Sequence, residues 1–103
     1  MSSSYVLLPD AEADLRGIIR YTRKQWGEAQ TRTYVAKLKS CIERMAEGDA
    51  GFKDMSALYP RLRMMRCEHH HIFGLPRDND GMAVVAIFHE RMDLMVRLAD
   101  RLK

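Results

Sequence analysis

The chain has 103 residues, a formal net charge of +3 and a sequence pI of about 9.1. This length supports one compact domain with a thin core, so residues 1–103 are expected to form a single domain. The charge is below that of a chromatin or ribosomal protein, but it fits an anionic partner, either protein or nucleic acid.

A short strand and two helices are predicted in the first half of the chain. Tyr5 to Leu8 is β-prone and is stopped by Pro9, which is typical of a first or edge strand. Asp10, Glu12 and Asp14 then cluster where the positive end of a helix dipole favours carboxylates. The first helix continues to Gly27, and the second covers residues 28–47 with Gly48 as its C-terminal cap.

The apolar residues of both predicted helices recur at helical spacing, so each helix carries one apolar stripe. The connection at Gly27 is so short that the helices must fold back on each other as an antiparallel hairpin. The stripes are expected to pair through Leu15, Ile18, Ile19 and Trp26 of the first helix and Tyr34, Leu38, Ile42 and Met45 of the second.

Three strands and a C-terminal helix are predicted in the second half. A loop at residues 49–60, anchored by Phe52, Met55 and Leu58, precedes strands at 61–66, 70–75 and 82–89. The last two strands are joined by a turn at 77–81, which contains the hairpin signal Asp80-Gly81. The strand at 82–89 is almost entirely apolar, which indicates a central position, and apolar residues between 94 and 102 indicate a short helix.

This order of elements predicts an α+β fold, in which the helical hairpin covers one face of an antiparallel sheet. The other face is then open, or is covered by the C-terminal tail or by a partner. Two cysteines, Cys41 and Cys67, are too few for a secreted disulfide framework, so reduced thiols in the cytoplasm are expected. No secretion signal is visible, and no stretch reaches the roughly 20 apolar residues of a membrane span.

Three consecutive histidines, His69, His70 and His71, raise the question of a metal site. Neighbouring residues of a strand point to opposite faces, so only His69 and His71 could share a metal. No carboxylate or cysteine pair stands nearby at ligand spacing. The favoured interpretation is two solvent-facing histidines beside one packed histidine, and no metal or cofactor is expected.

The densest basic stretch contains Arg61, Arg63 and Arg66, with Lys53 and the Tyr59-Pro60 turn before them. It is either a solvated strand face or a surface for phosphates or acidic side chains. Arg63 and His70 lie on adjacent predicted strands and could face each other. Metal-free RNA cleavage needs a base, an acid and cations, and the suitable residue types are His70, Glu68, Tyr59, Arg63 and Lys53.

A pattern of residues runs through nearly the whole chain and closes with His89-Glu90-Arg91-Met92-Asp93. Its earlier members are Ala11, Leu15, Ile18, Tyr21, Trp26-Gly27, Tyr34, Leu38, Ile42, Leu62-Arg63, His70-x-Ile72-Phe73 and Ile87-Phe88. The pattern resembles the RelE/ParE toxin superfamily, and its ending is similar to the H-x-R-M-D close of the ParE branch. Gly74 stands where ParE-like chains usually have a tyrosine, and no tyrosine follows Tyr59 to complete a RelE-type catalytic set.

The resemblance implies a helical hairpin on a curved antiparallel sheet, and a toxin of a bacterial type II toxin–antitoxin system, of the kind linked to plasmid maintenance. ParE-branch toxins trap DNA gyrase on cleaved DNA, whereas RelE-branch toxins cut mRNA in the ribosome. The leading hypothesis is a non-enzymatic gyrase inhibitor that acts on the A subunit. The alternatives are a ribosome-dependent endoribonuclease, with His70, Arg63, Glu68 and Tyr59 as catalytic residues, and a non-toxic adaptor of the same fold.

The target-contact candidates under the leading hypothesis are Arg63, Arg66, His70, His89, Arg91 and Asp93. The expected partner is a cognate antitoxin. It should be acidic over the contacting stretch and disordered when free, because a basic chain with an uncovered sheet face offers both cations and apolar surface. No membrane contact and no stable small-molecule ligand are expected.

Overall fold

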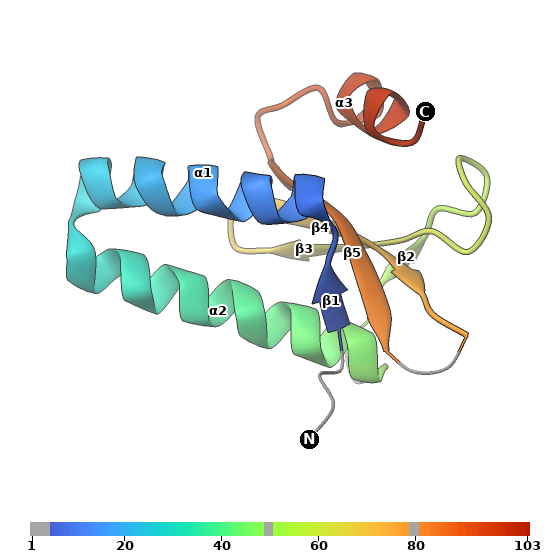
Figure 1. Cartoon of the computed structure of the whole chain (residues 1–103), viewed down its shortest axis with the longest axis horizontal. Coiled ribbons are helices and arrows are strands. Elements are labelled where there is room, and N and C mark those ends of the chain that lie inside the picture. The colour runs from blue at the N-terminus through green and yellow to red at the C-terminus, as the bar shows by residue number, and fades with distance from the viewer. Residues whose placement is uncertain (1–4, 49–50, 79–80) are drawn as a thin grey trace.

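A computed structural model describes residues 5–48, 51–78 and 81–103, and it shows helices on both faces of a five-stranded sheet (Figure 1). The α1–α2 hairpin covers one face, and α3 lies on the other. No helix among the described residues is long and apolar enough to cross a bilayer. The elements in chain order are β1 (Tyr5–Leu7), α1 (Pro9–Trp26), α2 (Glu28–Glu47), β2 (Lys53–Asp54), β3 (Arg63–Cys67), β4 (His70–Pro76), β5 (Met82–His89) and α3 (Leu94–Arg101).

The sheet has the order β1-β5-β4-β3-β2, which confirms the predicted α+β fold and the edge position of the first strand. Strands β2 to β5 are antiparallel neighbours, and β1 adds a parallel edge beside β5. The loop predicted at 49–60 contains one further strand, β2, which is only two residues long and pairs with β3. Residues 79 and 80 of the predicted β4–β5 turn lie outside the described residues.

The core under the hairpin is built largely from the predicted stripes. Leu38, Ile42 and Met45 of α2 are buried against Leu15 of α1 and against the sheet, while Ile18, Ile19 and Tyr34 pack at the edge of this core. The prediction for Trp26 is wrong, because 65% of this residue is exposed. At that end of the hairpin the buried positions are held by Thr22 and Thr31, while the indole of Trp26 lies outside.

A second core lies between the opposite face of the sheet and α3. Phe73 and Phe88 of the sheet, Leu62 before β3, and Leu98 of α3 are all buried there. Asp93 begins α3 as its N-cap, and its carboxylate accepts a hydrogen bond of 3.4 Å from the Val96 backbone N–H. The tail therefore covers the second face, which is one of the options that the sequence left open.

A largely buried ion pair joins α1, β5 and α3. The Asp14 carboxylate accepts hydrogen bonds of 2.9 and 3.0 Å from the Arg101 guanidinium and one of 3.0 Å from the Ile87 backbone N–H. Arg101 also donates to the Val85 carbonyl at 3.0 Å. Asp14 follows Ala11 by three residues and precedes Ile18 by four, so its position on the buried face of α1 was visible in the spacing.

The expectation of reduced thiols is wrong for this structure, because Cys41 of α2 and Cys67 of β3 form a disulfide. The two residues are 26 positions apart in the chain, and only the packing of α2 across the end of β3 brings them together. The bond ties the helical hairpin directly to the sheet.

Gly74 lies buried at an irregularity in the pairing of β4 and β5. A Cβ atom added there would meet three atoms of the Met82 side chain, with Cε and Cγ both at 2.9 Å. The Met82 side chain thus occupies the space beside Gly74, and a large side chain at position 74 would displace it.

Candidate functional site

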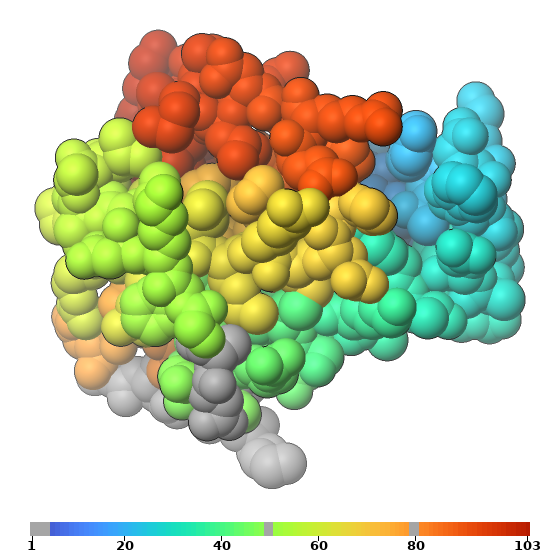
Figure 2. Space-filling model, turned by 180° about the vertical axis from the view of Figure 1, so that it is seen from behind, coloured from blue at the N-terminus to red at the C-terminus, as the bar shows by residue number. Residues whose placement is uncertain are grey.

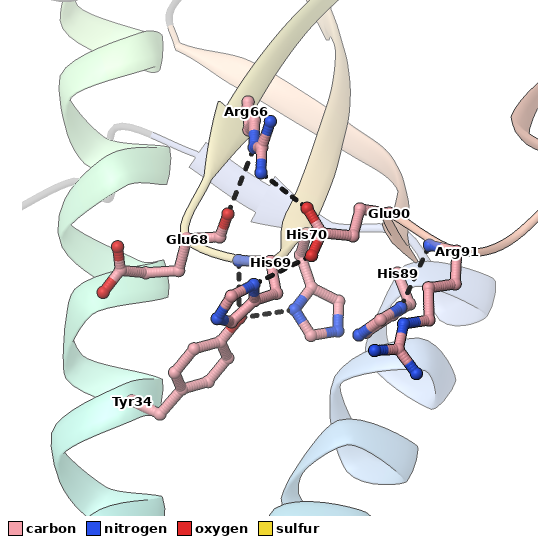
Figure 3. A network of polar contacts seen from close by, with 8 residues as sticks. All are labelled: Tyr34, Arg66, Glu68, His69, His70, His89, Glu90 and Arg91. Carbon is pink, nitrogen blue, oxygen red and sulfur yellow. Dashed lines mark hydrogen bonds and ion pairs between the residues drawn. The ribbon is translucent and has the colours of Figure 1, made fainter.

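All four histidines of the chain lie at one end of the sheet, where β3 turns into β4 and β5 ends, and Figure 3 shows His69, His70 and His89 there. His70 of β4 is the register partner of His89 of β5, and their rings meet edge to face with centroids 5.1 Å apart. We use the name histidine cluster for the eight residues drawn there: Tyr34, Arg66, Glu68, His69, His70, His89, Glu90 and Arg91.

Tyr34 of α2 connects the helical hairpin to this cluster. Its hydroxyl oxygen lies 2.6 Å from His70 Nδ1 and accepts a hydrogen bond of 3.1 Å from the His69 backbone N–H. Burial, aided by the nearby His89 and His69, lowers the pKa of His70 from 6.5 to about 4, so His70 is neutral at pH 7. Neutral His70 can therefore accept a hydrogen bond from the Tyr34 hydroxyl at Nδ1, and the sequence did not indicate this role for Tyr34.

Glu90 organises the exposed side of the cluster. Its carboxylate accepts hydrogen bonds from Arg66 at 2.6 Å and from His69 Nδ1 at 2.9 Å. The hydrogen bond from His69 is the main reason that the pKa of Glu90 is lowered. The Arg66 and His69 side chains remain more than 60% exposed, so they are oriented by Glu90 and still accessible to a partner.

The turn between β3 and β4 has only two residues, Glu68 and His69, and its backbone is held from several sides. Glu68 has a φ of 55°, a left-handed conformation that is uncommon for residues other than glycine. Lys37 of α2 pairs with the Glu68 carboxylate at 3.1 Å, and the Glu90 backbone N–H donates to the His69 carbonyl at 2.8 Å. These contacts compensate the unfavourable conformation and fix the position of the exposed side chains.

The predicted target contacts lie in three different places. Arg66, His70, His89 and Arg91 meet in the histidine cluster, where the Arg91 backbone N–H donates to His89 Nδ1 at 3.1 Å. Arg63 lies at the other end of β3, where its guanidinium stacks 4.3 Å from the centre of the Phe52 ring. The sixth candidate, Asp93, is the N-cap of α3.

The sequence left open whether Arg63 and His70 face each other across the sheet, and in the structure they do not. Arg63 is the register partner of Gly74, whereas His70 is the partner of Cys67 at the opposite end of the pair. Four residues along a strand separate the two positions by about 13 Å. Lys53 pairs beside β3 near Arg63, so the structure divides the proposed ribonuclease residues between two ends of the sheet.

The expected pattern of one packed and two solvent-facing histidines is confirmed for His70 and His69 and is wrong for His71. His71 is half-buried, and its Nδ1 is buried without a hydrogen-bond partner among the described residues. Burial is the main cause that lowers its pKa. The described residues contain no group of three or more histidine, cysteine or carboxylate side chains arranged to hold a metal ion.

The histidine cluster predicts a loss of stability in mild acid. Because the pKa of His70 is lower in the folded protein than the ordinary value of 6.5, the unfolded chain takes up a proton first as pH falls. The free energy of unfolding should therefore decrease as the pH falls from about 6.5 to about 4. Below about pH 4 His70 is protonated in both the folded and the unfolded protein, so it causes no further decrease. Urea unfolding from pH 7 to 4 measures this, and His70→Gln should flatten the curve in this window. Parallel curves for both proteins would contradict the neutral, buried state of His70.

Chemically, the cluster is a recognition surface. It presents the exposed cationic side chains of Arg66 and Arg91 and the exposed imidazole of His69, and the carboxylate of Glu90 holds Arg66 and His69 in place. Sequence reasoning missed Tyr34, His69 and Glu90. The available signal was the spacing of Tyr34, Lys37 and Cys41, which follow each other at three and four residues and therefore share one face of α2.

Comparison with known proteins gives consistent matches over nearly the whole chain. Residues 5–94 match the family described as the ParE toxin of the type II toxin–antitoxin system parDE. Toxin ParE of Escherichia coli is 64% identical over 101 residues, which cover 98% of both chains. Toxin ParE1 of Mycobacterium tuberculosis is 31% identical over 94 residues, which cover 91% of this chain and 96% of the relative.

A solved structure described as the chromosomal ParDE TA system from P. aeruginosa has the same fold. It superposes with a TM-score of 0.67 over 82% of this chain and 92% of that chain, at 12% sequence identity. The two proteins thus share the arrangement of the helical hairpin and the sheet. Their sequence identity is too low to assign functional residues of one protein to the other.

Proposed function

The chain belongs to the ParE toxin family of type II toxin–antitoxin systems, and from this membership we propose that it inhibits DNA gyrase without being an enzyme. Its place of action would be the cytoplasm, and its direct contact the A subunit of gyrase. The observation that carries the proposal is the histidine cluster, since Glu90 of the family-like ending bonds Arg66 and His69, and the same ending brings His89 and Arg91 into the cluster (Figure 3).

The arrangement of the residues favours binding over RNA cleavage. A metal-free nuclease needs its acid, its base and its cations around one phosphate. Here Arg63 and Lys53 lie at one end of β3, while His70 and Glu68 lie at the other. In addition, Nδ1 of His70 is engaged by Tyr34, and the residue is buried.

Purified protein is expected to inhibit DNA supercoiling by gyrase and to accumulate cleaved DNA. Arg66→Ala and Arg91→Ala should each raise the inhibitory concentration about tenfold, the cost expected for one lost hydrogen bond to a charged group. Arg77→Ala is the matched control, because it removes an exposed arginine outside the cluster, and it should change the inhibitory concentration less than twofold.

The ribosome assay must be run beside the gyrase assay. Codon-positioned mRNA cuts that disappear in His70→Ala or Arg63→Ala, with no effect of the protein on gyrase, would reject the proposal in favour of the endoribonuclease. A folded protein that affects neither gyrase nor mRNA would indicate the non-toxic adaptor.

The partner that silences such a toxin is its cognate antitoxin, and we propose that the contacting segment is acidic and amphipathic. Support comes from an apolar groove between α3 and the segment before β3, lined by Leu58, Tyr59, Met95, Leu98, Ala99 and Leu102. In Figure 2 this is the region where the red α3 meets the yellow-green segment. The antitoxin should abolish gyrase inhibition in the same assay, and undiminished binding by Met95→Asp toxin would contradict this location.

A further inference from the structure

The exposed side chains at the connected ends of α1 and α2 form a surface that lies outside both the core and the histidine cluster. We call residues 16–32 the hairpin tip; it extends away from the sheet (Figures 1 and 2). Two large aromatic side chains are exposed on it, Tyr21 at 63% and Trp26 at 65%. Tryptophan is a frequent anchor of binding surfaces, so the exposed Trp26 makes this surface a candidate contact for a partner.

The hairpin tip also concentrates the positive charge of the protein. It contains five basic residues and one acidic residue, a net charge of +4, whereas the chain as a whole has a net charge of +3. The other residues together are therefore slightly acidic. The basic members are Arg16, Arg20, Arg23, Lys24 and Arg32, and the acidic member is Glu28.

Most of this charge is available to a partner. Arg16 pairs with Glu12 at 2.9 Å, and Arg23 pairs with Glu28 at 2.8 Å, in contacts that are more than half exposed. Arg20, Lys24 and Arg32 are exposed and form no ion pair with any residue that the structure describes. Arg16, Arg20 and Arg23 are spaced four and three residues apart along α1, so they lie on one face of the helix. Neighbouring side chains at this spacing are about 5–6 Å apart.

We propose that the hairpin tip binds the phosphate backbone of double-stranded DNA. The inference rests on the proposed function, in which the DNA would be the segment held by gyrase, and it adds a second contact to the toxin–gyrase complex. Exposed cations around flat aromatic rings match a polyanion, because lysine and arginine neutralise phosphates while the rings contact sugars and bases. The groove beside α3 fits an acidic, amphipathic antitoxin segment better than the hairpin tip does, because the groove has the apolar lining that such a segment requires.

The dimensions of the hairpin tip predict what kind of DNA binding this is. Two helices side by side are about 20 Å wide, whereas the major groove is about 12 Å wide. The tip therefore cannot enter the groove as a recognition helix does, and it should contact backbone phosphates. Binding should then be independent of sequence and should weaken steeply with salt.

Trp26 is the one tryptophan of the chain, so its fluorescence reports directly on the hairpin tip. The purified protein is titrated with a mixed-sequence duplex of roughly 20 base pairs, about two helical turns, at low salt. We expect the emission to change saturably and the affinity to fall at least tenfold between about 50 and 200 mM salt. Emission that stays constant while DNA is shown to bind by anisotropy would place the contact elsewhere and overturn the proposal, as would the absence of any DNA binding.

Paired variants separate a local contact from the effect of net charge. The double variant Arg20→Gln with Lys24→Gln should weaken DNA binding about tenfold or more. The plot of log affinity against log salt should also become less steep by about two, because each lost phosphate contact removes about −0.9 from its slope. Lys39→Gln with Arg44→Gln makes the same change in net charge on exposed positions of α2 outside the tip. Equal weakening by both pairs would show that the attraction is diffuse and that no site exists at the tip.

Gyrase and antitoxin assays then distinguish the failure of this inference from that of the proposed function. The tip variant should need about tenfold more protein to inhibit gyrase, and it should bind the antitoxin as tightly as the original protein. If the original protein inhibits gyrase but the tip variant is equally active, the inference fails and the proposed function stands.

If antitoxin binding is lost in the tip variant, the surface belongs to the antitoxin and the inference is also wrong. If the original protein binds DNA through the tip but does not inhibit gyrase, the proposed function fails while the DNA contact stands.

Discussion

Leu38→Ala is expected to lower the free energy of unfolding by about 2–5 kcal/mol, the range for truncating a fully buried leucine. Leu38 has no exposed surface and lies in the middle of α2, between the buried side chains of α1 and the sheet. The substitution leaves a cavity where three elements meet, so the surrounding structure can close it only in part. Urea unfolding followed by circular dichroism measures the change.

Val96→Ala is the matched control for this prediction. Val96 is an apolar helical residue that is 57% exposed, so its truncation should change the free energy of unfolding by less than about 0.5 kcal/mol. A loss at Leu38 no greater than that at Val96 would contradict the packing of the hairpin against the sheet.

Removing the disulfide between Cys41 and Cys67 is expected to lower the free energy of unfolding by about 3.5 kcal/mol. The two cysteines are 26 positions apart, and the value follows from the entropy that a closed loop of this length removes from the unfolded chain. Unfolding curves with and without dithiothreitol measure the effect. Because the bond joins α2 to the end of β3, reduction should also loosen the histidine cluster and weaken the bond between Tyr34 and His70.

The double variant Cys41→Ala with Cys67→Ala provides the control, since its stability should not respond to the reductant. A reductant that lowers the stability of both proteins equally would point to an effect unrelated to the disulfide. Identical curves for the original protein in both conditions, together with two titratable thiols, would show that the bond is absent in solution.

The sequence alone determined the elements whose signals are local. The bounds of α2 agree with the prediction at both ends, because Gly27 and Gly48 interrupt the helical pattern on either side, and Gly48 has the left-handed φ of 80° that ends many helices. The strands β4 and β5 and the buried character of β5 followed in the same way from turn residues and from a continuous apolar run. The family was likewise visible in residues read directly from the chain.

Only the tertiary structure decided which side chains meet. Strand register placed Arg63 and His70 at opposite ends of one strand pair, because the two-residue turn at Glu68 and His69 fixes the pairing, and the sequence interpretation had left this alignment open. The packing of α2 on β3 joined Cys41 to Cys67, and Thr22 and Thr31 took the buried positions at the end of the hairpin where Trp26 remains in solvent. These outcomes depend on distances between elements that lie far apart in the chain. The hydrophobic period and the helix caps do not reveal such distances, because they report only on residues a few positions apart.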